Sequence, residues 1–211
     1  GTDMNLHEKT ITGHTRLTAL LGSPVSHSIS PLMHNEAFRL LGLDYVYLCF
    51  EVSEETLPTA VAGLRACNVR GFNLTMPCKN KIIDLLDDLS PAASLIGAAN
   101  TVVNENGRLV GHNTDGTGYM HAVTDAGHHI LGKTITVMGA GGAATAICAQ
   151  AALDGVKKIN IFARKTSRFY PRMQQLTDSI NALGTCEALL FDNADQTSLA
   201  RSVEESTLLL N

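Results

Sequence analysis

Thr134-Ile-Thr-Val-Met138 runs directly into Gly139-Ala-Gly-Gly-Ala-Ala144, and this stretch decides how the rest of the chain is interpreted. Its apolar, β-branched residues predict a strand, its glycines a tight turn, and its alanines the start of a helix. This order is typical of folds that bind the pyrophosphate of a dinucleotide. Gly139 would permit the turn, Gly141 would let the backbone approach the phosphates, and Ala144 would let the helix lie against the strand. The alternative is a plain strand-to-helix turn, but the correct segments on both sides favour a cofactor site.

The segment after the next strand indicates which dinucleotide binds. That strand is predicted over residues 158–162, and Ala163-Arg164-Lys165-Thr166 follows it without an acidic residue. NAD-binding folds commonly place a carboxylate here for the ribose hydroxyls, whereas an arginine accommodates the 2′-phosphate of NADP. A solvated basic loop is the alternative, and the position relative to the glycine turn favours phosphate binding. We therefore predict that NADP is bound by Gly139, Ala140, Gly141, Gly142, Ala143, Ala144, Arg164 and Lys165.

The composition limits the classes of protein to consider. The chain has 211 residues, of which 45% are hydrophobic and 17% charged, which suits one large or two small globular domains. A net charge of −4 gives no basic surface for nucleic acid, and the most apolar window, residues 135–156, resembles a strand and a buried helix more than a membrane span. The N-terminus lacks a signal-peptide pattern. Five scattered cysteines without a CxxC pair favour a reducing cytoplasm and no metal site.

Strand and helix patterns alternate along the chain, which predicts an α/β fold with parallel strands. The Asn106-Gly107 pair is a strong signal for a hairpin in this series. The expected strands cover residues 17–21, 44–51, 69–75, 97–103, 108–112, 134–138, 158–162, 186–190 and 207–210. The expected helices cover residues 31–41, 54–67, 81–89, 117–126, 143–153, 170–183 and 196–205.

Several polar residues lie where strands end, and each has a structural explanation. Ser30 precedes Pro31 and is expected to be the N-cap of the helix that follows, while Ser28 has no such task. Lys79 follows a strand and a proline, so it is either an ordinary loop lysine or an acid or base in a cleft. From the residues alone, the structural explanation is favoured for both Ser28 and Lys79. The three capping-type residues of Asn113-Thr-Asp115 exceed what one helix needs, which hints at a polar site.

Five motifs in order resemble those of the shikimate dehydrogenase family, of the quinate/shikimate type. The resemblance extends from about Leu20 to the last residue, and the five together are more specific than any one alone. They are Gly22-Ser-Pro-Val-Ser-His-Ser-Ile-Ser-Pro31 with His34-Asn35, Asn73-Leu-Thr-Met-Pro-Cys-Lys79, Gly97-Ala-Ala-Asn-Thr101, Asn113-Thr-Asp-Gly116 and Gly139–Ala144.

The resemblance implies an oxidoreductase that reversibly reduces 3-dehydroshikimate to shikimate with NADP, in aromatic amino-acid biosynthesis. It also implies that residues of four motifs bind the substrate: Ser28 and Ser30 its carboxylate, and Thr75, Asn100 and Asp115 its ring hydroxyls. Lys79 would be the catalytic proton donor or acceptor, with Asp115 as the catalytic carboxylate beside it. The chemistry agrees, because hydride transfer to a ketone leaves an alkoxide that an ammonium group can stabilise and protonate.

Two departures from the family pattern leave alternatives open. The NADP-specific members have Asn-Arg-Thr where this chain has Ala163-Arg164-Lys165, and the dual-specificity members have an aspartate where this chain has Thr166. This favours NADP over NAD. The family also continues past Asn211 with more of the nucleotide domain and a C-terminal helix that carries a substrate-binding glutamine. The alternatives are a quinate/shikimate dehydrogenase that uses NAD, and a shortened, ligand-binding form without catalysis.

The expected architecture is α/β with two domains. Residues 4–115 would form the substrate-binding and catalytic domain with a mainly parallel sheet, and residues 116–211 an incomplete NADP-binding domain of Rossmann type. The expected partner is a small molecule, shikimate or quinate, with no nucleic acid, membrane or metal involved. A cytoplasmic location is expected, and a homodimer is left open.

Overall fold

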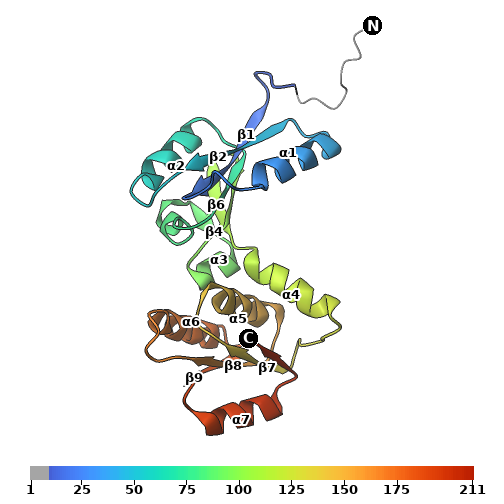
Figure 1. Ribbon diagram of the computed structural model, residues 1–211, viewed down its shortest axis with the longest axis vertical. Helices are drawn as coiled ribbons and strands as arrows, with labels where there is room; N and C mark the ends of the chain where they lie inside the picture. Colours follow the sequence, from blue (N-terminus) through green and yellow to red (C-terminus); the bar gives the residue numbers. More distant parts are fainter. Residues whose placement is uncertain (1–9) are drawn as a thin grey trace. The chain divides into compact units, whose positions relative to one another are not determined.

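The computed structural model describes residues 10–211, which form two compact α/β units (Figure 1). One unit contains the described residues up to Leu89 together with Ala98–His112. The other contains Ser90–Gly97 and Asn113–Asn211. The predicted α/β class is therefore confirmed, while the expected start of the first domain at residue 4 lies outside the described residues.

The first unit is built on a six-stranded sheet with the order β2-β1-β3-β5-β6-β4. Strand β1 pairs in parallel with β2 and β3, the β5–β6 hairpin is antiparallel, and β4 adds to β6 in parallel. Strand β5 runs antiparallel to β3, so the sheet is mixed. The bounds are β1 (Arg16–Gly22), β2 (Tyr45–Glu51), β3 (Gly71–Leu74), β4 (Asp88–Leu89), β5 (Thr101–Glu105) and β6 (Arg108–His112).

Two helices flank this sheet, α1 (Ser30–Leu41) and α2 (Leu57–Ala66). Leu17 and Leu21 of β1 line a hollow with residues of α2, whereas Thr18 lines a hollow with residues of α1. Because successive side chains of a strand point to opposite faces, α1 and α2 lie on opposite faces of the sheet. Helix α2 buries Leu57 and Val61, whereas no residue of α1 is buried.

The helix predicted over residues 81–89 is wrong. A 3-10 helix, η1 (Lys81–Leu85), is followed by extended chain, and Asp88 and Leu89 pair with Val110 and Gly111 as β4 and β6. The carboxylate of Asp87 accepts a 2.7 Å hydrogen bond from the backbone N–H of Leu109, which holds the segment against β6. Long-range pairing thus overrides the local helical pattern.

Helix α3 (Pro91–Ile96) was not predicted, although its start carries a clear signal. Ser90 is the N-cap and accepts a 3.2 Å hydrogen bond from the N–H of Ala93, and Pro91 is the first helical residue. Ser-Pro at the start and Gly97 in the left-handed conformation at the end form a standard pair of helix boundaries. The strand expected from residue 97 therefore begins only at Thr101.

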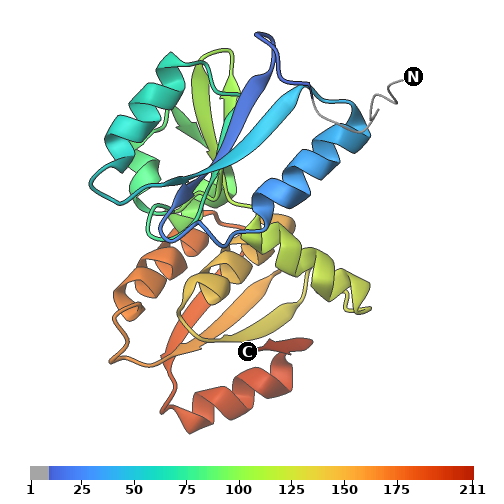
Figure 2. The same cartoon turned by 45° about the horizontal axis from the view of Figure 1, so that its top comes forward.

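The second unit has a four-stranded sheet of order β10-β7-β8-β9, in which every pairing is parallel. Helices α5 and α6 cover one face of this sheet and α7 lies along the other (Figures 1 and 2). The strands are β7 (Thr134–Met138), β8 (Lys158–Ala163), β9 (Glu187–Asp192) and β10 (Leu208–Leu210). The helices are α4 (Asp115–Asp125), α5 (Gly142–Asp154), α6 (Tyr170–Ala182) and α7 (Gln196–Glu205), together with α3.

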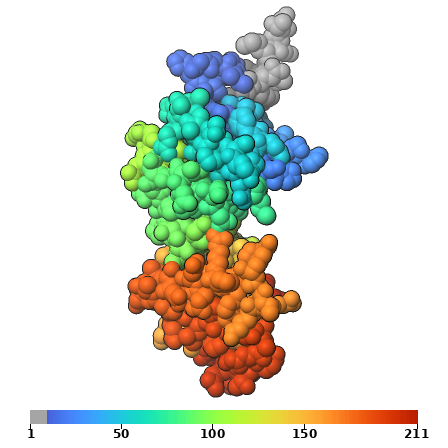
Figure 3. All heavy atoms as spheres, turned by 90° about the vertical axis from the view of Figure 1, so that its left-hand side faces the viewer, coloured from blue at the N-terminus to red at the C-terminus, as the bar shows by residue number. Residues whose placement is uncertain are grey.

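Strand β7 lies where the strand order reverses, because β8 and β10 flank it on either side. In open α/β sheets, ligands bind at the carboxyl ends of the strands next to such a reversal. Helix α5, which follows β7, buries a run of alanines and small residues against its neighbours. The face of this unit that Figure 3 shows is mostly orange and red, the colours of the segments that follow α5. The glycine turn between β7 and α5 is thus placed where the sequence predicted a dinucleotide site.

Candidate functional site

The first unit brings three of the predicted site segments together where β1 and β3 end and where β5 begins. The N–H of Thr75 donates a 3.0 Å hydrogen bond to the carbonyl of Leu21, and the N–H of Leu74 donates a 2.9 Å bond to the carbonyl of Asn100. A Cβ atom on Gly22 would lie 2.3 Å from Cγ2 of Thr75, so the end of β1 lies directly against this threonine. Thr75 and Asn100 are therefore neighbours in the fold although they come from different motifs.

Lys79 is attached to the same cluster through its backbone. Its carbonyl accepts a 2.9 Å hydrogen bond from the N–H of Ala99, the residue before Asn100. The preceding Cys78 is fully buried, and its thiol donates a 3.6 Å bond to the carbonyl of Val52. Burial raises the pKa of Cys78, which keeps it a neutral thiol and an anchor for the loop. Lys79 therefore follows a buried, fixed residue.

The serine motif is arranged differently from the prediction. Ile29, not Ser30, is the N-cap of α1, and Ser30 is the first helical residue without a side-chain cap bond. Ser28 instead stabilises the turn before the helix, because its hydroxyl accepts a 3.1 Å hydrogen bond from the N–H of Ser30. The reason is that residue 29 already has helical backbone angles, which brings the N–H of Ser30 to the side chain two residues before it. The predicted capping role of Ser30 is therefore wrong.

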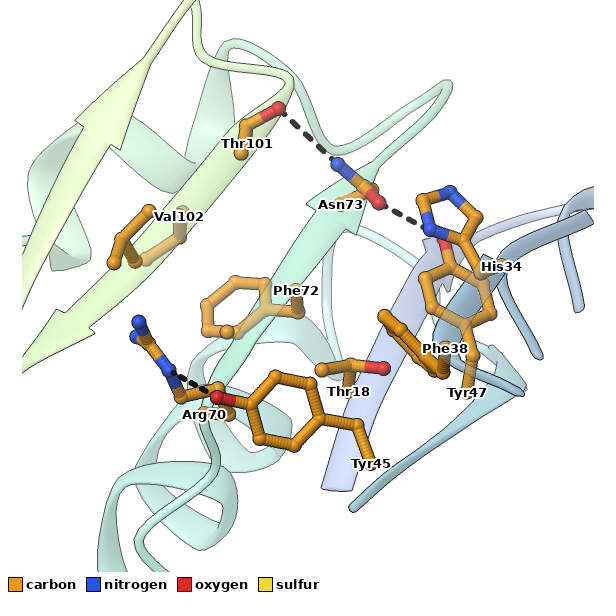
Figure 4. Close-up of a pocket in the computed structure, with 12 residues that line it drawn as sticks. Thr18, His34, Phe38, Tyr45, Tyr47, Arg70, Phe72, Asn73, Thr101 and Val102 are labelled. Carbon is orange, nitrogen blue, oxygen red and sulfur yellow. Dashed lines mark hydrogen bonds between the residues drawn. The ribbon is translucent and has the colours of Figure 1, made fainter. Parts of the chain in front are cut away.

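Tyr47 joins the serine motif to the rest of the cluster, and the sequence analysis missed it. Its hydroxyl donates a 3.0 Å hydrogen bond to Oδ1 of Asn73 (Figure 4). It is also hydrogen-bonded to the side chain of Ser30. The amide of Asn73 donates in turn to the Thr101 hydroxyl at 3.1 Å and to the Asn100 carbonyl at 3.3 Å. Tyr47 and Asn73 therefore connect Ser30 to the backbone carbonyl of Asn100 through hydrogen bonds.

Two signals could have identified Tyr47. The alternation along β2 places it on the same face as Tyr45 and Cys49, and a buried tyrosine hydroxyl usually has a hydrogen-bond partner. Only 2% of Tyr47 is exposed, and burial raises its pKa to about 12. Its hydroxyl therefore remains protonated and acts as a hydrogen-bond donor at neutral pH.

A cavity of about 270 Å³ lies beside this network, between α1 and the sheet (Figure 4). The imidazole of His34 stacks on the Tyr47 ring with centroids 4.2 Å apart, and Phe38 meets Tyr45 edge-on at 5.4 Å. Burial lowers the pKa of His34, which favours the neutral imidazole in this stack. At the far end, Nε of Arg70 donates a 3.3 Å bond to the Tyr45 hydroxyl. The cavity is thus aromatic in the middle and polar at both ends.

Asp115 belongs to the second unit, where it is the first residue of α4. Its N–H donates a 3.1 Å hydrogen bond to Oδ1 of Asn113, so Asn113 fixes the start of the helix. Thr114 occupies the N-cap position without a side-chain cap bond. Of the three capping-type residues, Asn113 therefore orders the turn, and Asp115 lies in the first turn of α4.

The glycine turn has the geometry of a phosphate cradle. Gly139 has a φ of +126°, which side chains rarely allow, and its N–H donates a 2.7 Å bond to the carbonyl of Phe162. Gly141 is the N-cap of α5, and a Cβ atom on Gly141 or Gly142 would meet no heavy atom within 4 Å. Ala144 is buried and lies against Gly139. The start of α5, where the first N–H groups of a helix lack intrahelical partners, therefore borders open space at Gly141 and Gly142.

The basic segment Arg164-Lys165 follows β8 at the same edge of the sheet. Met138 and Phe162 are paired at the carboxyl ends of β7 and β8, so the two loops leave neighbouring strands side by side. Arg164 is exposed, and its carbonyl accepts a 2.9 Å bond from the N–H of Ser167 in a turn. The residues after β8 carry positive charge and no carboxylate up to Asp178, the next acidic residue.

Over residues 10–211, no group of three or more His, Cys, Asp or Glu side chains is arranged to hold a metal ion. The five cysteines are free thiols, three of them buried. Within the same described range, none of the helices is both long enough and apolar enough to cross a membrane.

Comparison with known proteins agrees with this geometry. A family model described as "Shikimate dehydrogenase substrate binding domain" matches residues 20–102. "Shikimate dehydrogenase (NADP(+))" of Listeria innocua is 56% identical over 201 residues, which cover 95% of this chain and 69% of the relative. The chain belongs to the shikimate dehydrogenase family. Shikimate 5-dehydrogenase from Listeria monocytogenes, solved in complex with shikimate and NAD, is 55% identical with a TM-score of 0.89, over 96% of this chain and 70% of that one.

The similarity to shikimate dehydrogenases extends over both units. The family match over residues 20–102 includes the serine, lysine and asparagine motifs that the first unit joins by hydrogen bonds. The Listeria relatives also align with the second unit, which carries Asp115 and the glycine turn. A ligand-free 5-ketofructose reductase of Gluconobacter has the same fold at 32% identity, with a TM-score of 0.75 over 86% of this chain and 64% of that chain.

Proposed function

We propose that this protein is an NADP-dependent shikimate dehydrogenase that reversibly reduces 3-dehydroshikimate to shikimate in aromatic amino-acid biosynthesis. The observation that carries this proposal is the hydrogen-bonded cluster that links Ser30, Tyr47, Asn73 and Asn100 and adjoins Thr75 and Lys79. Each of these residues except Tyr47 belongs to a motif of the shikimate dehydrogenase family, to which the chain belongs. The cluster is therefore the substrate site that we assign to the first unit.

We assign the carboxylate of the substrate to Ser28 and Ser30, and its ring hydroxyls to Thr75, Asn100 and Asp115. The serine hydroxyls can donate to a carboxylate. The hydroxyl of Thr75, the amide of Asn100 and the carboxylate of Asp115 can each accept a hydrogen bond from an alcohol. NADPH supplies a hydride to the ketone carbon when it is bound. The ammonium of Lys79 would give its proton to the oxygen of that carbon, and in the reverse direction the amine would take the proton back. Asp115 is assigned as the catalytic carboxylate, as the family motif implies.

The second unit fits a dinucleotide on three grounds. Gly139 has the conformation that the turn requires, the start of α5 borders open space, and Arg164 and Lys165 follow β8 without an acid. An arginine at this position suits the 2′-phosphate of NADP. We assign cofactor binding to Gly139, Ala140, Gly141, Gly142, Ala143, Ala144, Arg164 and Lys165, and substrate and cofactor domains to residues 4–115 and 116–211.

A second candidate is a quinate/shikimate dehydrogenase that uses NAD. It is supported by the Listeria monocytogenes relative, whose structure was solved with shikimate and NAD. Steady-state assays with shikimate and quinate, each with NADP and NAD, separate the two candidates. We expect the highest kcat/KM for shikimate with NADP. A higher value with NAD would overturn the cofactor assignment, and calorimetric binding of shikimate without turnover would indicate a ligand-binding protein.

We also propose a cytoplasmic location. Light scattering of the purified protein tests whether it forms a homodimer.

A further inference from the structure

Apolar burial does not fix the position of α1, the helix that carries Ser30. None of its residues is buried, and four of its five large apolar side chains are between 60% and 76% exposed, namely Leu32, Met33, Leu40 and Leu41. Its contact with the sheet relies on Phe38, which packs against the cluster of Leu20, Val25 and Tyr47. Because hydrophobic contact is non-directional, it does not specify how α1 is rotated or shifted along β2.

Asn35 supplies the missing directional contact. Its Nδ2 donates a 3.0 Å hydrogen bond to the carbonyl of Tyr47, and its Oδ1 accepts a 2.9 Å bond from the N–H of the same residue. Strand β2 is at the edge of the sheet, so these backbone groups have no neighbouring strand on that side. The Asn35 amide therefore pairs with Tyr47 as another strand would. A shift of α1 by one residue would break both bonds.

We propose that Asn35 is a positioning residue for the substrate-carboxylate site, acting through Tyr47 on Ser30. Two bonds fix the backbone of Tyr47 relative to α1, and the His34 ring stacks on its side chain from the same helix. The Tyr47 hydroxyl is then held where it meets both Ser30 and Asn73. This inference rests on the proposed function, because it takes Ser30 to bind the substrate.

The chain contains a matched control for this contact. Asn181 of α6 donates a 2.9 Å bond to the carbonyl of Ala188 and accepts a 2.8 Å bond from its N–H. Ala188 lies in β9, which is the edge strand of the second sheet. The two asparagines therefore make the same pair of bonds to an edge strand, but only Asn35 lies in the serine motif.

The test compares Asn35→Ala with Asn181→Ala. Each variant loses two hydrogen bonds, so both should have a lower Tm. Only Asn35→Ala should raise the KM and calorimetric Kd for shikimate, by about tenfold, with kcat and the KM for NADP within about threefold of wild type. Asn35→Ser retains a hydroxyl and should fold more readily, with a smaller rise in KM. An equal rise in both alanine variants, or none in Asn35→Ala and Asn35→Ser, would overturn the proposal.

A substrate analogue separates positioning of the carboxylate site from general damage. In the analogue, a hydroxymethyl group replaces the carboxylate of shikimate, so the strong charge-assisted bonds to the serines are absent. Asn35→Ala should weaken binding of shikimate but change the Kd of the analogue by less than about twofold. Equal weakening of both ligands would contradict a role at the carboxylate. Absence of turnover in the wild type would overturn only the proposed function, because calorimetric binding of shikimate still tests Asn35; absence of binding would overturn both.

Discussion

The hydroxyl of Tyr47 donates a 3.0 Å hydrogen bond to Oδ1 of Asn73, and this contact crosses β1 to join β2 to β3. In the sheet, Tyr47 pairs with Thr18 and Asn73 pairs with Leu20, so the tyrosine reaches diagonally over the central strand. The Asn73 amide extends the connection to Thr101 in β5. The elements that carry the proposed substrate residues of the first unit are therefore held by one partly buried polar network, which is costly to leave partly satisfied.

Replacing Tyr47 by Phe tests this network. The ring and its stacking on His34 are retained, but Oδ1 of Asn73 loses its donor and Ser30 loses its partner. We expect the free energy of unfolding to fall by about 1–3 kcal/mol, because a partly buried acceptor is left unpaired. The KM for shikimate should rise about fivefold or more while the KM for NADP stays unchanged. Denaturant unfolding and steady-state kinetics measure the two effects; an unchanged KM for shikimate would show that the network is structural only.

Lys79→Ala tests the proton-transfer role. General acid catalysis typically contributes about 10²- to 10⁴-fold, so kcat should fall within that range in both directions. Shikimate should still bind in calorimetry, since the serines and Asn100 are unchanged. The control is Lys81→Ala, which removes another lysine two residues further on, at the first residue of η1. Near-normal turnover in Lys79→Ala, or an equal loss in Lys81→Ala, would remove Lys79 from the mechanism.

Arg164→Ala tests the choice of cofactor. Removing a charged donor to the 2′-phosphate should cost about 1.5–3 kcal/mol, so kcat/KM for NADP should fall at least about tenfold. The value for NAD, which lacks that phosphate, should change little. Lys157→Ala is the control, because Lys157 lies just before β8, at the opposite end from Arg164. Equal losses with NADP and NAD would contradict phosphate recognition by Arg164.

Two glycines of α4 should respond oppositely to alanine. A Cβ atom on Gly116 would lie 2.6 Å from the carbonyl oxygen of Ala146 and 2.6 Å from Cβ of Gln150, whereas one on Gly118 would meet nothing within 4 Å. Gly116→Ala should therefore force α4 away from α5 and lower the free energy of unfolding by about 1–3 kcal/mol. Gly118→Ala should be neutral or stabilising by up to about 1 kcal/mol through helix propensity. Thermal unfolding of both variants checks this, and similar Tm values would refute the close packing of α4 on α5.

Asp87→Asn should alter stability in a pH-dependent way. The Arg65 guanidinium and then the N–H of Leu109 hold the pKa of Asp87 below its ordinary value of 3.8. A lowered pKa in the folded state stabilises the protein above the unfolded value, and this contribution is lost as the pH falls through the folded value. The variant should therefore have a lower Tm than wild type at about pH 6, and the difference should shrink below about pH 4. Calorimetric Tm values across this range decide; a constant difference would exclude the linkage.

The errors in the sequence analysis have different origins. Residues 86–89 have helical spacing, but η1 ends at Leu85 because Asp88 and Leu89 pair with β6, which is about twenty residues away in the chain. The signals for α3, by contrast, are local, since Ser90 and Pro91 mark its start. The N-cap role predicted for Ser30 is wrong for a third reason. The helix starts at Ser30 itself, one residue earlier than Pro31 suggests, so Ile29 is the N-cap.

The sequence by itself determined the α/β class, the strand-turn-helix unit at Gly139 and the order of the family motifs. These features depend on neighbouring residues, through the period of apolar side chains and the backbone freedom of glycine. Only the tertiary structure decided that Tyr47 joins Ser30 to Asn73 and that Asn35 pairs with the edge of β2. Local patterns specify which residues a strand or helix will bury, but partners that meet through folding are selected by packing and register.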